Sequence, residues 1–338
     1  MKTRFLLSLL LVPAVASLPL RAATASYHLL KEIPVGGDGG WDYLSIDSAA
    51  HRLYVSHGNT VVAIDTEQNT VAGTIADTPG VHGMAVAPEL KRGFTTNGRE
   101  NKASVVDLET LKTLSKVDTG QNPDGMVYEP GQQEVYVFNG RSNNATVIDA
   151  KAAKVVATIA LNGKPEFATA DPKAGRVFNN LEDKSEVVAI DTKTHAVVNR
   201  WPIAPGEGAS GMAFDADHHR LFLGCGNKLM VMLDSTSGKV VASVPIGQGV
   251  DANAFDPGTQ LAFASCGDGT VTIAHEDSPD KLTVVQTLTT EARARTMTLD
   301  PKTHRIYLAS ASYLAPAAGA KGRPQMVPGS FKILVYGM

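Results

Sequence analysis

Seven positions, spaced 40 to 44 residues apart, hold the side chains of this sequence best suited to bind a ligand or move a proton. They comprise four carboxylates, one imidazole, one guanidinium and one hydroxyl: Asp42, His82, Asp124, Glu166, Ser210, Asp251 and Arg295. Carboxylates brought close together raise one another's pKa or attract a cation. Oxygen ligands with one imidazole suit a hard divalent ion, or a cationic or polyhydroxylated small molecule. The alternative is a merely polar, hydrated surface in which Arg295 neutralises a neighbouring acid.

A second, weaker set of polar side chains lies in turns about 15 residues further along the chain. His57 belongs to "SHGN", and Arg99 and Arg141 belong to the similar stretches "NGRENK" and "NGRSNN". Guanidinium groups beside a binding site would suit a carboxylate or phosphate on a ligand. Solvated turn arginines are the alternative interpretation.

The elements that position these residues follow from a repeat. Aromatic residues recur at intervals of 40, 42, 42, 44, 41 and 44 residues, at Tyr54, Phe94, Tyr136, Phe178, Phe222, Phe263 and Tyr307. An acid precedes most of them by seven residues, and a second Asp follows most of them by about twelve. Because these acids repeat in equivalent turns, we interpret them as scaffold that stabilises turns, together with His51, His219 and His304.

Each repeat contains four short β-branched runs separated by turn residues, which is the spacing of a propeller blade. Seven repeats predict an all-β fold, a seven-bladed β-propeller of four-stranded antiparallel blades. The last repeat ends with "FKILVYGM", which supplies a third strand but no fourth, whereas "YHLLKEIPVGG" near the start resembles a fourth strand. We therefore expect the N-terminal strand to complete the last blade and remove an open sheet edge.

The stretches "RLYVSHGN" and "EVYVFNGR" resemble the YVTN repeat of bacterial seven-bladed propellers, the group that includes the YncE-like periplasmic proteins. The resemblance covers residues 27–338. It implies the propeller fold and an exported binding protein, and it raises single-stranded DNA binding as a further option. It supplies no catalytic signature that this sequence matches.

Residues 1–25 have a positive start, an apolar core and a small-residue stretch ending at Ala25, as secretory signal peptides do. We expect cleavage after Ala25, a periplasmic or secreted protein without a transmembrane segment, and a single propeller domain over 26–338. A Pro/Ala/Gly-rich insertion at about 311–330 in the last blade would form a flap, a partner-binding loop or a disordered excursion.

Charge and cysteine content narrow the classes of function. The formal charge of −3 becomes −6 without Lys2, Arg4 and Arg21, so nucleic-acid binding is not expected. Cys225 and Cys266 occupy equivalent positions in adjacent blades, where second strands diverge beyond disulfide reach. We expect two buried thiols and a monomeric protein.

These observations favour a non-catalytic module that binds a small molecule or a protein partner on the loop face, with its ligand site at the mouth of the central channel. A metal-assisted lactonase- or lyase-type enzyme is the alternative, with His82 and either Glu166 or Asp124 as base, acid or metal ligand. No cofactor motif occurs in the sequence, although a divalent cation at the channel mouth would fit the acids.

Overall fold

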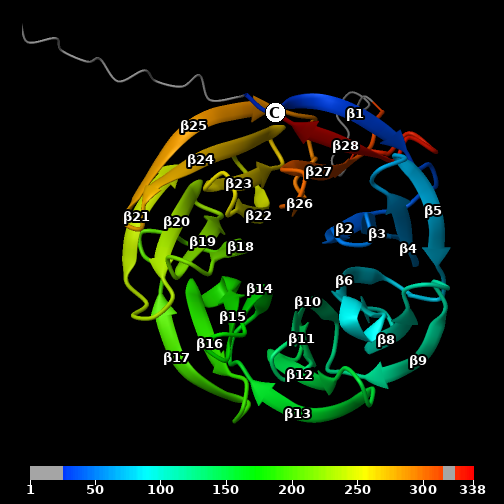
Figure 1. Cartoon of the computed structure of the whole chain (residues 1–338), viewed down its shortest axis with the longest axis horizontal. Helices are drawn as coiled ribbons and strands as arrows, with labels where there is room; N and C mark the ends of the chain where they lie inside the picture. Colours follow the sequence, from blue (N-terminus) through cyan, green and yellow to red (C-terminus); the bar gives the residue numbers. More distant parts are fainter. Residues whose placement is uncertain (1–25, 315–323) are drawn as a thin grey trace, which may run out of the picture.

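The computed structural model describes residues 26–314 and 324–338. The expected signal peptide and the centre of the insertion lie outside the described residues. Within them, the strands form seven sheets of four antiparallel strands each. Figure 1 shows these sheets, numbered here as blades 1 to 7 in chain order, arranged in a ring. The predicted seven-bladed β-propeller is therefore confirmed.

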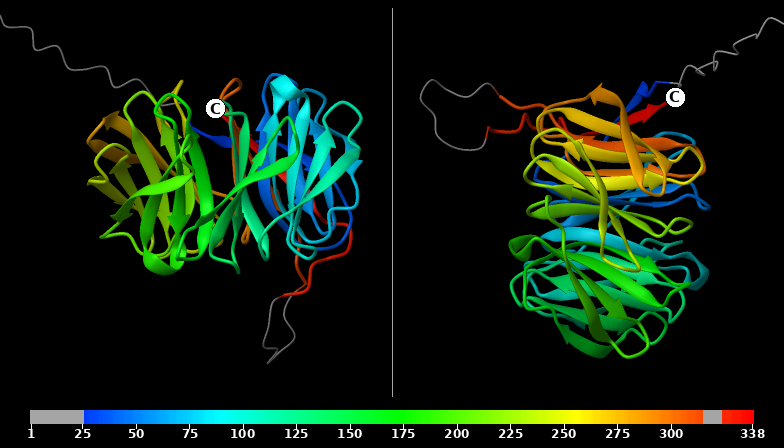
Figure 2. Two further views of the ribbon diagram at one scale, coloured as in Figure 1. Left: turned by 90° about the horizontal axis from the view of Figure 1, so that it is seen from below. Right: turned by 90° about the vertical axis from the view of Figure 1, so that its left-hand side faces the viewer.

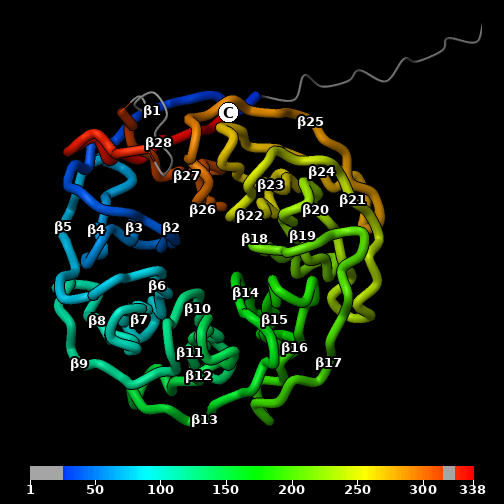
Figure 3. Tube along the Cα trace, turned by 180° about the vertical axis from the view of Figure 1, so that it is seen from behind, coloured from blue at the N-terminus to red at the C-terminus, as the bar shows by residue number. Residues whose placement is uncertain are grey.

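Each blade runs from an innermost strand to an outermost strand, as the tube in Figure 3 shows from behind. The innermost strands are β2 (Trp41–Asp47), β6 (Val81–Ala87), β10 (Pro123–Glu129), β14 (Pro165–Asp171), β18 (Ala209–Asp215), β22 (Val250–Asp256) and β26 (Met297–Asp300). The second strands are β3 (Arg52–His57), β7 (Arg92–Asn97), β11 (Glu134–Asn139), β15 (Arg176–Leu181), β19 (Arg220–Cys225), β23 (Leu261–Cys266) and β27 (Arg305–Ser310).

The third strands are β4 (Thr60–Asp65), β8 (Lys102–Asp107), β12 (Asn144–Asp149), β16 (Glu186–Asp191), β20 (Leu229–Asp234), β24 (Thr270–Ser278) and β28 (Lys332–Gly337). The outermost strands are β5 (Thr70–Ile75), β9 (Thr113–Asp118), β13 (Lys154–Ala160), β17 (Ala196–Pro202), β21 (Val240–Pro245), β25 (Lys281–Thr289) and β1 (His28–Pro34). Two short 3-10 turns, η1 (Pro88–Leu90) and η2 (Glu182–Lys184), complete the elements. The described residues contain no helix long and apolar enough to cross a membrane.

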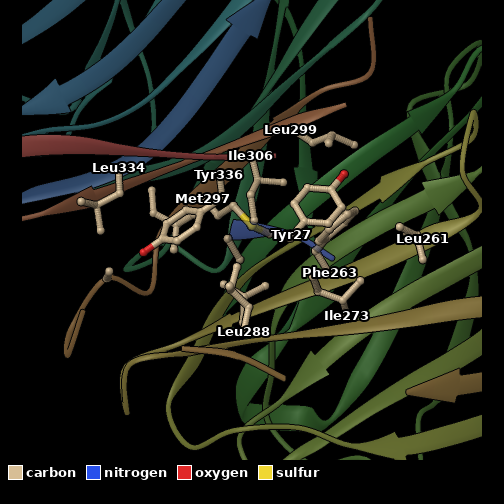
Figure 4. Close-up of a cluster of buried hydrophobic side chains, with 14 residues drawn as sticks. Tyr27, Leu261, Phe263, Ile273, Leu288, Met297, Leu299, Ile306, Leu334 and Tyr336 are labelled. Atoms are coloured by element: carbon tan, nitrogen blue, oxygen red, sulfur yellow. The ribbon is translucent and has the colours of Figure 1, made fainter. Parts of the chain in front are cut away.

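The apolar core lies between neighbouring blades. Every aromatic residue of the repeated column is at most 2% exposed. In the cluster of Figure 4, Phe263 of blade 6 packs with Met297 and Ile306 of blade 7. Burial of such side chains against the next blade holds adjacent sheets together, since each sheet alone would leave one apolar face exposed to water.

The repeated acids stabilise turns by accepting backbone hydrogen bonds. Asp47 accepts from the N–H groups of Ala49 and Ala50, and Asp65 accepts from those of Glu67 and Gln68. The residue before each second strand has a positive φ, between 52° and 63°, and the seven are His51, Lys91, Gln133, Gly175, His219, Gln260 and His304. His51, His219 and His304 therefore belong to turn geometry, as the repeat indicated.

The N-terminal strand completes the last blade, as predicted. β1 pairs antiparallel with β28, and Ile33 of β1 lies opposite Ile333. Just before β1, the Tyr27 hydroxyl donates to the His304 carbonyl (2.7 Å), and the Tyr27 ring packs edge-on against Phe263 (5.2 Å between centroids). The first described residues are thus fixed to blades 6 and 7.

Both cysteines are buried and free. Burial raises the pKa of the Cys225 and Cys266 thiols to about 12, so neither is a reactive thiolate near neutral pH. Their expected role as buried apolar side chains matches this environment.

Ring closure through β1 is testable by a matched pair of substitutions on that strand. We expect Ile33→Ala to lower the free energy of unfolding by about 2–5 kcal/mol, because Ile33 is buried between blades 7 and 1. Leu29→Ala should change it by no more than about 0.5 kcal/mol, since Leu29 is 45% exposed. Urea denaturation of both variants provides the measurement, and equal effects would contradict the role of β1 in closure.

Candidate functional site

A break in strand register positions the predicted site residues. In six innermost strands the pairing with the second strand is irregular directly at the ring position, for example between Trp41 and Leu44 and between Pro123 and Met126. Such a bulge redirects side chains at the end of a strand and increases its local twist. Blade 7 differs, because β26 begins only at Met297 and Arg295 lies in the preceding segment.

Six of the seven ring positions meet in one cavity of about 300 Å³, and they are Asp42, Asp124, Glu166, Ser210, Asp251 and Arg295. We call this cavity the channel mouth. Gly208 and Gly226 also line it, so it opens toward the face formed by the links between blades and the turns between second and third strands. His82 lies instead in an adjoining groove, of about 710 Å³, that shares Asp42 with the channel mouth.

His82 joins two of the acids. Its Nδ1 lies 2.8 Å from Asp42 Oδ2 and 3.5 Å from Asp124 Oδ1. Because a carboxylate only accepts, His82 Nδ1–H is the donor to Asp42. Burial lowers the pKa of His82, but the hydrogen bond to Asp42 and the charges of Asp124 and Asp42 outweigh it, so the pKa is raised overall. The imidazole is therefore favoured in its charged form.

Burial raises the pKa of three carboxyls of the channel mouth, Asp124, Asp251 and Glu166. Burial raises the pKa of Asp124 to about 6, with His82 opposing the shift and Asp42 adding to it. Burial also raises the pKa of Asp251 to about 6, although Arg295 Nε lies 3.3 Å from its Oδ2. Burial likewise raises the pKa of Glu166, although its ion pair with Lys164 opposes the shift.

Charged and aromatic side chains that the sequence analysis did not identify also line the channel mouth, namely Tyr43, Lys164, Phe167 and Glu182. Tyr43 packs on Phe167 across the channel, with 4.7 Å between the ring centroids. Burial, with Asp124 and Glu166 nearby, raises the pKa of Tyr43 well above its ordinary value, so its hydroxyl stays protonated. Regular strand alternation would point Asp42 and Tyr43 to opposite faces, and only the bulge allows both to line the cavity.

The residues of the second predicted set lie in two different environments, since Arg99 and Arg141 are exposed and His57 is buried. Arg99 and Arg141 are exposed and line the groove beside His82, where Arg99 also donates to Asn59 Oδ1 (3.3 Å). His57 is only 7% exposed and stacks on Phe331, with 4.1 Å between the ring centroids. Burial lowers the pKa of His57, which fits a packed neutral imidazole between blades 1 and 7.

The described ends of the insertion also lie beside the channel mouth. Tyr313 and Pro324 line a third hollow, of about 320 Å³, together with Arg293, Arg295 and Trp41. The Arg293 guanidinium lies 5.0 Å from the centre of the Tyr313 ring, a cation–π contact. In Figure 2 these ends extend from one face of the ring.

Comparison with known proteins shows the fold and no more. No family model and no curated protein matches the chain. Among solved structures, a chain of Kuenenia stuttgartiensis hydrazine synthase is similar, with a TM-score of 0.70 and 18% sequence identity. The match covers 81% of this chain and 94% of that chain. At this identity the likeness concerns the propeller architecture alone.

The raised pKa of Asp251 predicts a pH-dependent gain in stability for Asp251→Asn. The folded pKa of about 6 lies above the ordinary 3.8, so the wild type loses stability as the pH rises from about 4 to 6. Asparagine does not titrate. In urea denaturation, the free energy of unfolding of the variant should therefore match that of the wild type near pH 4 and exceed it at pH 7.5 by up to about 3 kcal/mol.

The half-buried turn residue Asp191 provides a control of opposite sign. Backbone N–H donation from Thr194 lowers the pKa of Asp191, so its stabilisation is present above the unfolded pKa and is lost as the pH falls. Asp191→Asn should therefore destabilise the protein at pH 7.5 and have less effect at low pH. The same sign for both variants would contradict the assignment of Asp251.

Proposed function

We propose that this protein is a non-catalytic binding module that takes up a positively charged group of a small ligand at the channel mouth. One observation carries the proposal: five carboxylates surround a single cavity of about 300 Å³, namely Asp42, Asp124, Glu166, Glu182 and Asp251. A volume of this size holds a small molecule or one end of a larger one.

The charges of the channel mouth do not balance. Lys164 pairs with Glu166 and Glu182, and Arg295 pairs with Asp251. Asp42 and Asp124 then share His82, so acids outnumber bases even when the imidazole is protonated. Burial makes this excess negative charge costly, which the raised pKa of Asp124 reflects. A bound cation would offset that cost, so the relief of the buried negative charge would contribute to the binding free energy.

The adjoining groove suits a ligand that carries both charges. Arg99 and Arg141 lie in the groove that shares Asp42 with the channel mouth. A cationic group in the channel mouth would place a carboxylate or phosphate of the same ligand toward these guanidinium groups. We therefore propose a zwitterionic or amine-bearing small molecule as the ligand, with Tyr43 and Phe167 supplying apolar contact.

The repeated sequence motif supports membership of the YVTN-repeat, YncE-like group. The pattern of residues 1–25 supports export through a signal peptide that ends at Ala25. We propose a mature protein with one propeller domain over 26–338 that acts in the periplasm or outside the cell. The acidic channel mouth disfavours single-stranded DNA, which requires a basic groove.

A second candidate function rests on Asp42, His82 and Asp124. One ligand atom from each lies within 4.8 Å of the others, a spacing that would allow a divalent ion to bind. Such an ion would polarise a carbonyl or activate water for lactone hydrolysis. The raised pKa of His82 weighs against this candidate, because the ion must displace the proton of an imidazole that Asp42 stabilises.

Removal of two acids from the channel mouth tests the binding proposal. Trp41 lines the adjoining groove, so its fluorescence can report titrations with lysine, putrescine and Ca²⁺. We expect Asp124→Asn with Glu166→Gln to weaken binding of the cationic ligand at least about 100-fold, because hydrogen bonds to charged groups contribute about 1.5–3 kcal/mol each and two are lost. Asp107→Asn, in a turn at the opposite end of the strands, is the control. Equal affinities in all three proteins, or binding of anions only, would refute the proposal.

Catalysis is tested separately by elemental analysis and a lactone-hydrolysis screen. The enzyme candidate predicts a bound divalent ion that His82→Ala removes, and a rate at least 100-fold lower in that variant. The binding proposal predicts no hydrolysis by either protein.

A further inference from the structure

A second group of charged side chains lies between blades 5 and 6, at the end of the strands away from the channel mouth. Asp215 ends β18, His218 lies in the turn that follows, and Glu276 belongs to β24 of the next blade. His218 Nδ1 lies 2.8 Å from Asp215 Oδ2 and 3.4 Å from Glu276 Oε1. One ligand atom from each of the three residues lies within 4.8 Å of the others.

Comparison among the blades shows that this group departs from the scaffold. Glu276 occupies a position whose backbone N–H donates to the carbonyl of the residue before the second strand. Six blades share this hydrogen bond, and their residues at the position are Thr66, Leu108, Ala150, Thr192, Ser235 and Glu276. Only Glu276 is ionisable. The position three residues after the turn acid reads Ala50, Leu90, Gln132, Ala174, His218, Thr259 and Thr303, so His218 is also the sole imidazole. Turn formation requires neither residue.

Glu276 is a buried carboxyl whose oxygens accept no hydrogen bond from the described residues. Its side chain is 0% exposed, and neither of its oxygens has a hydrogen-bond partner among the described residues. His218 Nδ1 likewise has none, because its contacts with the acids lack hydrogen-bond geometry. Arg220, in the same turn, is engaged with Asp234 and Asp280. A buried carboxylate whose oxygens accept no hydrogen bond is costly even beside an imidazole, so a missing group is indicated.

We propose that Asp215, His218 and Glu276 bind a divalent first-row transition ion such as Zn²⁺, which links blade 5 to blade 6. One imidazole and two carboxylates are ligands that Zn²⁺ accepts, and ligand atoms about 2 Å from one ion lie about 3–4 Å apart. Asp215 Oδ1 accepts from the Asp217 backbone N–H (3.0 Å), which fixes the carboxylate. The His218 side chain is 32% exposed, so the ion and a coordinating water have access from solvent.

The competing explanation is a proton in place of the ion. Burial and the charge of Asp215 raise the pKa of Glu276 to about 7, so a neutral Glu276 would share a proton with Asp215. The position of His218 favours the ion over the proton. Two carboxyls can share a proton without an imidazole, whereas His218 Nδ1 lies 3.4 Å from Glu276 Oε1.

Metal binding by the full chain tests this proposal independently of the channel mouth. After treatment with EDTA and dialysis, the wild type should bind one Zn²⁺ at this site by calorimetry, and Co²⁺ should produce the visible absorption of a low-coordinate complex. Glu276→Gln should lower that affinity at least about tenfold. His82→Ala, in the groove beside the channel mouth, and Asp280→Asn, a nearby exposed carboxylate, should leave it unchanged.

Thermal unfolding provides a second measurement that separates binding from misfolding. Without metal, Glu276→Gln should be at least as stable as the wild type, because it removes a buried carboxyl. With saturating Zn²⁺ the order should reverse, since only the wild type gains from the ion. The proposal is overturned if Zn²⁺ stabilises both proteins equally, if it stabilises neither, or if His82→Ala abolishes binding while Glu276→Gln retains it.

Discussion

Backbone N–H groups in the tight turns of this protein need acceptors, and this requirement organises the whole ring. Side-chain carboxylates meet it in most blades, as Asp47 and Asp65 do in blade 1. Blade 2 has Ala87 where the others have an acid, and there the turn becomes the 3-10 turn η1. Because capped turns fix how far each strand extends, seven unequal sequences produce blades that pack against one another.

The same residue type serves two opposite electrostatic purposes. Donation from backbone N–H groups lowers the pKa of Asp191 and Asp107, so these turn acids are stabilised as anions. Burial among other acids raises the pKa of Asp124 and Asp251 at the channel mouth. A bound cation therefore gains more from Asp124 and Asp251, whose ionised forms lack such donors among the described residues, than from Asp107 or Asp191.

The sequence predicted the fold well because a propeller repeats its constraints. Tyr54 and its six counterparts occupy equivalent buried positions, so one period identifies the whole architecture. The site was harder to predict from the sequence, because it depends on the bulges that begin the innermost strands. Asp42 could be recognised by its column, but Tyr43 required knowledge that two consecutive side chains line one cavity. His57 shared its column with polar residues, yet Phe331 from the last blade covers it. Contacts across the closure are not encoded in any single repeat.

Closure of the ring also has a consequence for the order of folding. β1 (residues 28–34) is made before the other strands, but its partner β28 (residues 332–337) is made after them. During synthesis, β1 therefore has no strand to pair with while blades 1 to 6 can already form from local hairpins. Until β28 arrives, β27 lacks its neighbour and β1 has no strand through which to join blade 7. The period of greatest exposure to aggregation or proteolysis thus falls at the end of folding, and it lasts as long as the two termini need to meet.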